Sequence, residues 1–262
     1  DVDPTRIEAA RKNGVEVVDG AADVARAAKH IITSLPSPKA FQEVAEGICG
    51  SGTQARIIAE TSTLTLEDKH AGAKILAAAG HVLLDCPLSG TGAQAAARDL
   101  VVYASGDPAA IEAIAPAFAD CTRELHNVGA FGNGTRIKLV ANLLVAINNV
   151  ASAEAMVLGM KAGLDPHQLV KLISAGAANS RIFELRAPLM ADRTYEPPTM
   201  SIGLWQKDMK VIDEFARSLG CPTPLFTATE AVYRAALSMG QASQDTASVC
   251  SVLEAMAGLR RD

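Results

Sequence analysis

Short apolar runs alternate with longer amphipathic segments along the first half of the chain. The apolar runs predict strands at 15–18, 30–35, 56–60, 81–85, 100–104 and 123–128. Helices are predicted between these strands, including one over 65–80 with Leu66, Ala71 and Ile75 facing inward. Near-continuous apolar strands that are separated by helices are typical of a mostly parallel sheet with both faces covered. The first half is therefore predicted to be an α/β domain.

From Gly132 onward the pattern changes, because every convincing segment has helical spacing and the strand signals disappear. The predicted helices cover 133–162, 166–175, 179–191, 202–219, 225–239 and 244–258. We place the domain boundary near residue 130, with an α/β domain over 1–130 and an all-helical domain over 131–262. Clefts at such junctions are the usual place for a small-molecule site.

The run from Gly132 to Gly159 is predicted to form one long, mostly apolar helix that opens the second domain. Lys138 and Asn142 lie four residues apart, so their side chains project from the same face, and Asn149 lies near that line. Burying an ammonium group without a partner is unfavourable. Lys138 therefore either lies at a solvated edge, with its stem on apolar surface, or has a chemical task.

Composition and charge limit the classes of protein to which the chain can belong. It has 262 residues, of which 49% are apolar and 20% are charged, and its net charge is −5. Because the basic residues are scattered, we expect no nucleic-acid partner and no anionic membrane surface as a partner. The most apolar stretch, 137–159, carries Lys138, three asparagines and Glu154, so we expect no membrane span.

The cysteines and histidines indicate neither a disulfide framework nor a metal site. The five cysteines are odd in number, lie far apart and form no Cys-x-x-Cys pair. The five histidines lack the spacing of metal ligands. We therefore expect a protein of the reducing cytoplasm without a resident metal.

A search for a dinucleotide-binding fingerprint finds one weak candidate. Gly90-Thr-Gly-Ala-Gln-Ala95 matches Gly-x-Gly-x-x-Gly/Ala and follows a predicted strand. The sequence after it lacks the long helix and the strand with a terminal acid that the fingerprint requires, so this segment is more typical of a turn than of a phosphate-binding loop. The chain begins at Asp1, immediately before a capped helix, where the second strand of a dinucleotide fold would end in the acid that binds the adenosine ribose. A true fingerprint would then precede Asp1.

Several segments, spread over the whole chain, match one known family in the expected order. They are Asp1-Val-Asp-Pro4, Ser34-Leu-Pro36, Glu60-Thr-Ser-Thr63, Asp85-Cys-Pro-Leu-Ser-Gly90, Gly132-Asn-Gly-Thr-Arg-Ile-Lys-Leu-Val-Ala-Asn142 and Lys207-Asp208. Together they resemble the 3-hydroxyisobutyrate dehydrogenase family, the β-hydroxyacid dehydrogenases related to 6-phosphogluconate dehydrogenase. The family's first strand, glycine loop and first helix are absent from this sequence, which we expect to be incomplete there. Thr91 stands where a second glycine is usual, which we expect to affect the choice of substrate.

The resemblance implies a role for each matching segment. The first domain is expected to be Rossmann-like, dinucleotide-binding and N-terminally incomplete, and the second to bind substrate and form a dimer interface. Lys138 is implied as the catalytic residue. The implied substrate contacts are Ser89, Gly90, Thr91 and Asn142. The implied cofactor contacts are Asp1, Leu35, Pro36, Ser62, Thr63 and Lys207.

The implied reaction is hydride transfer between NAD(H) and a small β-hydroxyacid or its semialdehyde, such as 3-hydroxyisobutyrate, glycerate/tartronate semialdehyde or a threonate-like sugar acid. Oxidation requires a base to take the hydroxyl proton, and Lys138 can do this if desolvation lowers its pKa. Asn142 would hold the hydroxyl or the carboxylate. Ser89 and the backbone N–H groups of Gly90 and Thr91 would bind the carboxylate. Asp1 favours NAD over NADP, because a carboxylate repels a 2′-phosphate.

Each role has a simpler structural alternative. Ser62 and Thr63 could merely cap the following helix, and the Lys207-Asp208 pair could be ordinary surface charge. Asn149 could face solvent or bond within the helical domain. For the whole protein, the alternative is a non-catalytic relative that keeps the fold for cofactor binding or association. Whether enzyme or not, a homo-oligomer, dimer or tetramer, is expected, because an apolar helical domain commonly packs against another copy.

Overall fold

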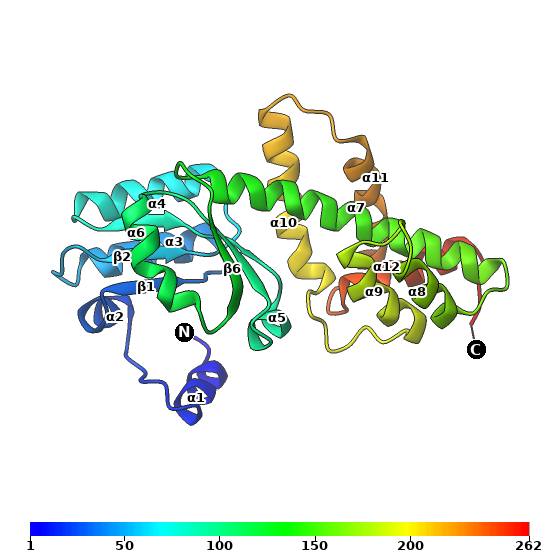
Figure 1. Ribbon diagram of the computed structural model, residues 1–262, viewed down its shortest axis with the longest axis horizontal. Coiled ribbons are helices and arrows are strands. Elements are labelled where there is room, and N and C mark those ends of the chain that lie inside the picture. Colours follow the sequence, from blue (N-terminus) through cyan, green and yellow to red (C-terminus); the bar gives the residue numbers. More distant parts are fainter. Residues whose placement is uncertain (262) are drawn as a thin grey trace. The chain divides into compact units, whose positions relative to one another are not determined.

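The computed structural model describes residues 1–261, which divide into two compact units (Figure 1). The first unit contains Asp1–Ser89 and Arg98–Thr135, and the second contains Gly90–Ala97 and the chain from Arg136 onward. All six strands lie in the first unit, and the second unit is helical. The predicted fold class is confirmed: a Rossmann-like, mostly parallel α/β domain is followed by an all-helical one. The boundary near residue 130 stays a prediction.

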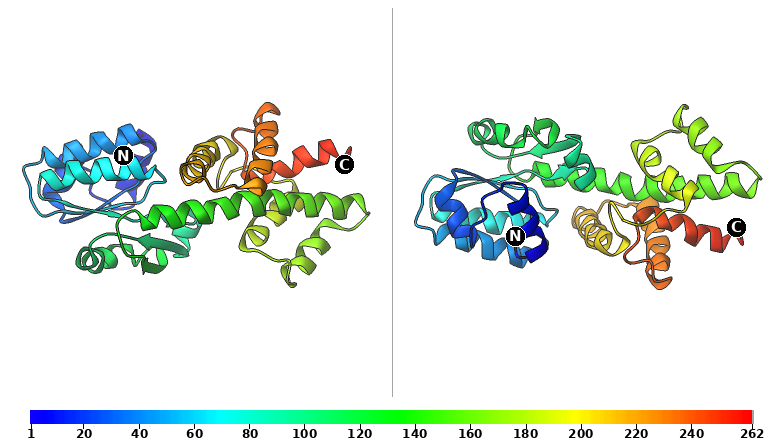
Figure 2. Two further views of the ribbon diagram at one scale, coloured as in Figure 1. Left: turned by 90° about the horizontal axis from the view of Figure 1, so that it is seen from above. Right: turned by 90° about the horizontal axis from the view of Figure 1, so that it is seen from below.

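The first sheet is entirely parallel and has both faces covered. Its strands, in spatial order, are β1 (His30–Thr33), β2 (Ile57–Glu60) and β3 (Val82–Asp85). The helices around it are α2 (Ala21–Ala27), α3 (Pro38–Cys49), α4 (Leu66–Ala78) and α6 (Pro108–Ile114). Ile58 and Leu83 pack in one core with α3 and α4, which lie side by side (Figure 2), whereas the next residues, Ala59 and Leu84, pack in another with α6. Successive side chains of a strand point to opposite faces, so β2 and β3 are buried on both faces, whereas β1 buries Ile31 and leaves Ile32 43% exposed.

A second sheet continues from the edge of the first. It consists of β4 (Leu88–Ser89), β5 (Leu100–Ala104) and β6 (Thr122–Asn127). β4 runs antiparallel to β5, and β5 runs parallel to β6. The backbones of Asp85 and Ser105 exchange two hydrogen bonds, of 3.0 and 2.8 Å, and so join the two sheets where β3 and β5 end.

The strand predicted at 15–18 does not form. The backbone N–H of Val15 instead donates to the carbonyl of Ala10, 3.0 Å away, in the turn that ends α1 (Pro4–Lys12). Residues 15–18 pair with no strand among residues 1–261, and Val15 is 56% exposed. A short apolar run becomes a strand only where a neighbouring strand accepts its hydrogen bonds.

Helix α4 forms as predicted, but only part of its predicted inner face is buried: Ile75 packs against the core and Leu66 is half-buried. Ala71 is exposed, and the fully buried positions are Lys69, Gly72 and Leu76. Gly72 lies so close to Phe41 that an added Cβ would come within 2.2 Å of its ring. A buried lysine thus takes part in the face that packs on the sheet, which apolar spacing alone does not predict.

The second unit is built almost entirely from helices. They are α5 (Gly92–Ala96), α7 (Asn133–Lys161), α8 (Pro166–Ser174), α9 (Arg181–Asp192), α10 (Ile202–Ser218), α11 (Pro224–Ser238) and α12 (Val249–Met256), of which α7 begins in the first unit. Their buried apolar residues form one core that includes Phe226, Trp205 and Tyr233. A 3₁₀ turn at Thr246–Ser248 precedes α12. In the first unit, a similar turn at Ala115–Phe118 follows α6.

The long helix α7 is a core helix of this unit. By length and composition it would suffice to cross a membrane, with a mean hydropathy of 1.5 in its most apolar stretch, but half of that stretch is buried inside the protein. Asn149 is also buried, and its amide donates to the Tyr233 hydroxyl and the Thr246 carbonyl, each at 2.9 Å. Asn149 therefore bonds within the helical unit, which was one of the two alternatives left open by the sequence.

Candidate active site

Lys138 and Asn142 lie one turn apart on α7, and α10 contributes Lys207 and Asp208 to the same cluster. The Asn142 amide donates to the Asp208 carboxylate at 3.0 Å, and the Lys207 ammonium lies 3.8 Å from it. Asn142 and Asp208 are buried, Lys138 is half-buried, and Lys207 is exposed. Three predicted site residues, Lys138, Asn142 and Lys207, thus share one cluster with an acid for which the sequence offered no distinct role.

The position of Asp208 follows from the pattern of α10. The buried apolar residues Ile202, Trp205, Met209 and Ile212 recur every three or four positions and form the inner face of the helix. Asp208 lies between two of them and is turned inward, so it is not the surface charge considered as an alternative. A buried carboxylate needs hydrogen-bond or charged partners, and Asn142 and Lys207 supply them.

The electrostatics of this cluster lower the pKa of Lys138. Burial lowers the pKa of Lys138; Asp208 opposes the shift, and Lys207 adds to it. Burial raises the pKa of Asp208, against the effects of Lys207, of Lys138 and of the hydrogen bond from Asn142. A lysine with a lowered pKa can accept a proton nearer neutral pH, which is what a general base must do.

The predicted cofactor contacts of the first unit lie at the carboxyl ends of β1 and β2. Leu35 and Pro36 follow β1, and Ser62 and Thr63 follow β2. The backbone N–H of Leu35 donates to the Ser62 hydroxyl at 2.6 Å, which joins the two segments. Ligands of open parallel sheets bind at the carboxyl ends of the strands, and hydroxyl and backbone groups there suit the ribose and amide of a nicotinamide cofactor.

Ser62 and Thr63 do not cap the following helix. The N-cap of α4 is Thr65, whose hydroxyl accepts a hydrogen bond from the backbone N–H of Asp68. This removes the simpler structural explanation for the two residues before it.

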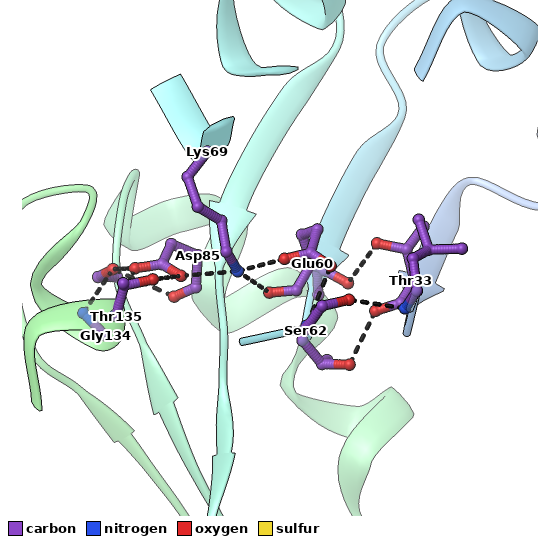
Figure 3. A network of polar contacts seen from close by, with 11 residues as sticks. Thr33, Glu60, Ser62, Lys69, Asp85, Gly134 and Thr135 are labelled. Atoms are coloured by element: carbon purple, nitrogen blue, oxygen red, sulfur yellow. Dashed lines mark hydrogen bonds and ion pairs between the residues drawn. The ribbon is translucent and has the colours of Figure 1, made fainter. Parts of the chain in front are cut away.

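Beneath these strand ends lies a buried ion triad that the sequence did not predict. The Lys69 ammonium pairs with the carboxylates of Glu60 and Asp85, and all three side chains are fully buried (Figure 3). Glu60 ends β2 and Asp85 ends β3, and the two are direct neighbours in the parallel register. The sequence held one sign that Lys69 is buried: Lys69, Gly72 and Leu76 are spaced at three and four residues, so they lie on one face of the helix.

Asp85 also holds the start of α7. Its carboxylate accepts hydrogen bonds from the Thr135 backbone N–H at 2.7 Å and from the Thr135 hydroxyl at 2.8 Å. The N–H of Gly134 donates to the Ser105 hydroxyl at 3.0 Å. These side chains satisfy two of the backbone donors that every helix leaves free at its first turn.

The predicted carboxylate-binding segment, Ser89 to Thr91, joins β4 to α5. Ser89 is half-buried and Gly90 is exposed with a φ of 127°. Both the backbone N–H and the hydroxyl of Thr91 donate to the Gln94 side chain, at 2.7 and 2.8 Å. A substrate carboxylate would have to displace Gln94 to reach the N–H of Thr91, so the predicted anion site depends most on Ser89 and Gly90.

Asp1 is exposed, and its carboxylate accepts a hydrogen bond from the backbone N–H of Asp3 at 2.9 Å. Asp3 in turn caps α1. Within residues 1–261, no group of three or more histidine, cysteine, aspartate or glutamate side chains is arranged to hold a metal ion.

Two family models match consecutive parts of the chain. Residues 1–129 match the NAD-binding domain of 6-phosphogluconate dehydrogenase. Residues 132–253 match the NAD-binding domain of NADP-dependent 3-hydroxyisobutyrate dehydrogenase. The two matches meet near the position where the sequence pattern changes.

Individual relatives agree with these matches. Glyoxylate/succinic semialdehyde reductase 2 of Arabidopsis thaliana is 32% identical over 67% of this chain and 49% of its own length, so the chain spans about half of that relative. The 2-hydroxy-3-oxopropionate reductase of Escherichia coli is 28% identical over 93% of this chain and 84% of its own length. The structure of Mycobacterium tuberculosis 3-hydroxyisobutyrate dehydrogenase with L-serine superposes with a TM-score of 0.85 at 25% identity, covering 97% of this chain and 89% of that one.

Proposed function

Because the chain belongs to the β-hydroxyacid dehydrogenase family that includes 3-hydroxyisobutyrate dehydrogenase, we propose that it transfers a hydride between NAD(H) and a small β-hydroxyacid or its semialdehyde. The observation that carries this proposal is Lys138, half-buried with a lowered pKa beside Asn142 and Asp208. The relatives reported above are named for reductions of small acids that carry an aldehyde group, which supports substrates such as 3-hydroxyisobutyrate, tartronate semialdehyde or a threonate-like acid.

In the oxidative direction, neutral Lys138 takes the proton of the substrate hydroxyl. In the reverse direction, protonated Lys138 donates to the carbonyl oxygen. Asp208 fixes one amide hydrogen of Asn142, so the amide is oriented for a substrate oxygen. The nicotinamide cofactor, when bound, accepts or supplies the hydride. The residues that would hold it are Asp1, Leu35, Pro36, Ser62, Thr63 and Lys207.

Replacing Lys138 tests this assignment. Lys138→Ala should lower kcat by two or more orders of magnitude, since general acid–base catalysis typically contributes about 10²- to 10⁴-fold, with the affinity for NADH nearly unchanged. Lys161→Ala is the matched control, because Lys161 lies at the exposed end of the same helix. Turnover by Lys138→Ala equal to that of the control would refute the mechanism.

The substrate and the cofactor are tested together. NAD and NADP reduction is measured with a panel of three- to six-carbon hydroxyacids. Asp1 predicts faster turnover with NAD, and equal rates with both cofactors would contradict its proposed role. The alternative, a non-catalytic cofactor-binding protein, predicts that NADH binds but that no acid in the panel is oxidised.

We also propose a homo-oligomer, dimer or tetramer. On α7, Val140 and Leu144 are 58% and 53% exposed, and Leu158 is 73% exposed. Apolar side chains exposed along one helix favour association with another protein surface. The mass of the protein in solution, by light scattering, decides between monomer and oligomer.

A further inference from the structure

We propose that the buried Lys69 is a positioning residue for the two cofactor segments, residues 35–36 after β1 and residues 62–63 after β2. It acts through the Glu60 carboxylate on Ser62. This inference rests on the proposed function for the claim that Ser62 and Leu35 contact the cofactor. The claim that Lys69 holds the two segments in place is independent of the proposed function.

The Lys69 ammonium contacts three oxygen atoms, through two ion pairs and one hydrogen bond. It pairs with a Glu60 carboxylate oxygen and with Asp85 at 3.1 Å, and it donates to the Glu60 backbone carbonyl at 3.2 Å. A buried lysine so fully bonded is rigid. It touches the two strand ends, β2 and β3, at which the parallel sheet opens to ligands.

An ion pair and two hydrogen bonds link this lysine to the residues that follow β2 and β1. The second carboxylate oxygen of Glu60 accepts a hydrogen bond from the Ser62 backbone N–H at 3.0 Å. The Ser62 hydroxyl accepts one from the Leu35 backbone N–H at 2.6 Å. Figure 3 shows Glu60 between Lys69 on one side and Ser62 on the other. The orientation of the Glu60 carboxylate therefore fixes Ser62, and Ser62 fixes the segment after β1.

The charge of Lys69 makes this arrangement possible. Glu60 and Asp85 are cross-strand neighbours, both fully buried, and like charges in that position repel. With Lys69 between them the triad carries a net charge of −1 (−1 + 1 − 1). Without it, the Glu60 carboxylate would turn away from Asp85 and lose its bond to Ser62.

The double variant Lys69→Met/Glu60→Gln separates positioning from charge. It keeps the net charge at −1, on Asp85, and keeps a side-chain oxygen that can accept from the Ser62 N–H, but nothing then fixes that side chain. Lys74→Met is the matched control, because Lys74 is an exposed lysine on the same helix.

Amide hydrogen exchange, followed by NMR without cofactor, is the primary measurement. In the double variant, the amides of Leu35 and Ser62 should exchange about tenfold faster, the factor expected for one hydrogen bond. The amides of β5 and the control variant should be unchanged. Unchanged exchange at Leu35 and Ser62, or an equal rise throughout the unit, would overturn the proposal.

NADH binding, by fluorescence titration, tests the functional half. The dissociation constant of the double variant should rise about tenfold, with that of Lys74→Met unchanged. If the wild-type protein binds neither NADH nor NADPH while the local exchange still rises, the proposed function fails and the positioning role stands. If the exchange rises but NADH binds as tightly as in the wild type, Lys69 positions the segments without serving the cofactor, and that part of the proposal is wrong.

Should the double variant not fold, Glu60→Gln alone, which leaves Lys69 paired with Asp85, is expected to give the same local rise in amide exchange at Leu35 and Ser62.

Discussion

Gly134, in the first turn of α7, has no room for a side chain. A Cβ at this position would lie 2.3 Å from the Tyr103 carbonyl oxygen, 2.8 Å from the Asp85 carbonyl oxygen and 2.9 Å from the ring of Pro87. Two of these three atoms are backbone atoms at the ends of buried strands, so they cannot move aside as a flexible side chain would. Gly134→Ala must therefore shift the start of α7 away from the sheet.

The magnitude follows from two opposing effects. Overpacking a well-packed site typically costs about 1–3 kcal/mol, and three contacts below 3.0 Å place this site at the upper end of that range. Alanine is favoured over glycine in a helix by about 1 kcal/mol. The net loss of stability should be about 2 kcal/mol, or a decrease in Tm of roughly 4–8 °C for a chain of this size.

Thermal and urea unfolding, followed by far-UV circular dichroism, measure this loss. Gly92→Ala in α5 is the matched control, because no atom lies within 4 Å of its added Cβ. The control should be neutral or slightly stabilising. A Gly134→Ala protein with the Tm of the wild type, or of the control, would refute the packing argument.

Two further predictions concern charged side chains. The pKa of Lys138 is lower in the folded state than in the unfolded chain, so the folded protein binds fewer protons at pH values between the two. The free energy of unfolding should therefore rise as pH rises through that range. Urea unfolding at several pH values should show this rise in the wild type and not in Lys138→Met. Arg186→Met should lower stability by about 3–5 kcal/mol, because it leaves the buried Asp245 carboxylate without its cation. Arg181→Met on the same helix, which breaks an exposed pair with Glu184, should cost less than about 1 kcal/mol in the same urea titration, and similar losses for the two variants would contradict this reasoning.

The sequence predicted the elements of this fold better than the faces they turn inward. Apolar spacing located α4 and placed Ile75 correctly against the core, but it missed the most buried positions, because these include a lysine whose partners, Glu60 and Asp85, come from two different strands. A one-dimensional pattern counts Lys69 as polar and assigns it to solvent. The strand predicted at 15–18 failed for a related reason, since a strand depends on a neighbour that local sequence cannot supply.

The candidate site shows the same division. Lys138, Asn142 and Lys207 were named from a resemblance to a family, and the structure gathers them into one cluster. Asp208 received no separate role, although it is the residue that bonds Asn142 and acts on the pKa of Lys138. Its importance depends on burial, and burial is set by how α10 packs rather than by its neighbours in sequence.

The bond between Asp85 and Thr135 has a consequence for how the protein acquires its structure. The negatively charged group at the positive end of the α7 dipole comes from a residue 50 positions earlier in the chain. A fragment that begins at residue 133 would therefore contain all of the longest helix and still lack the groups that stabilise its first turn. That turn should become ordered only after β3 and β5 have come together, which makes the beginning of α7 a late event in folding, while its middle can form from local contacts.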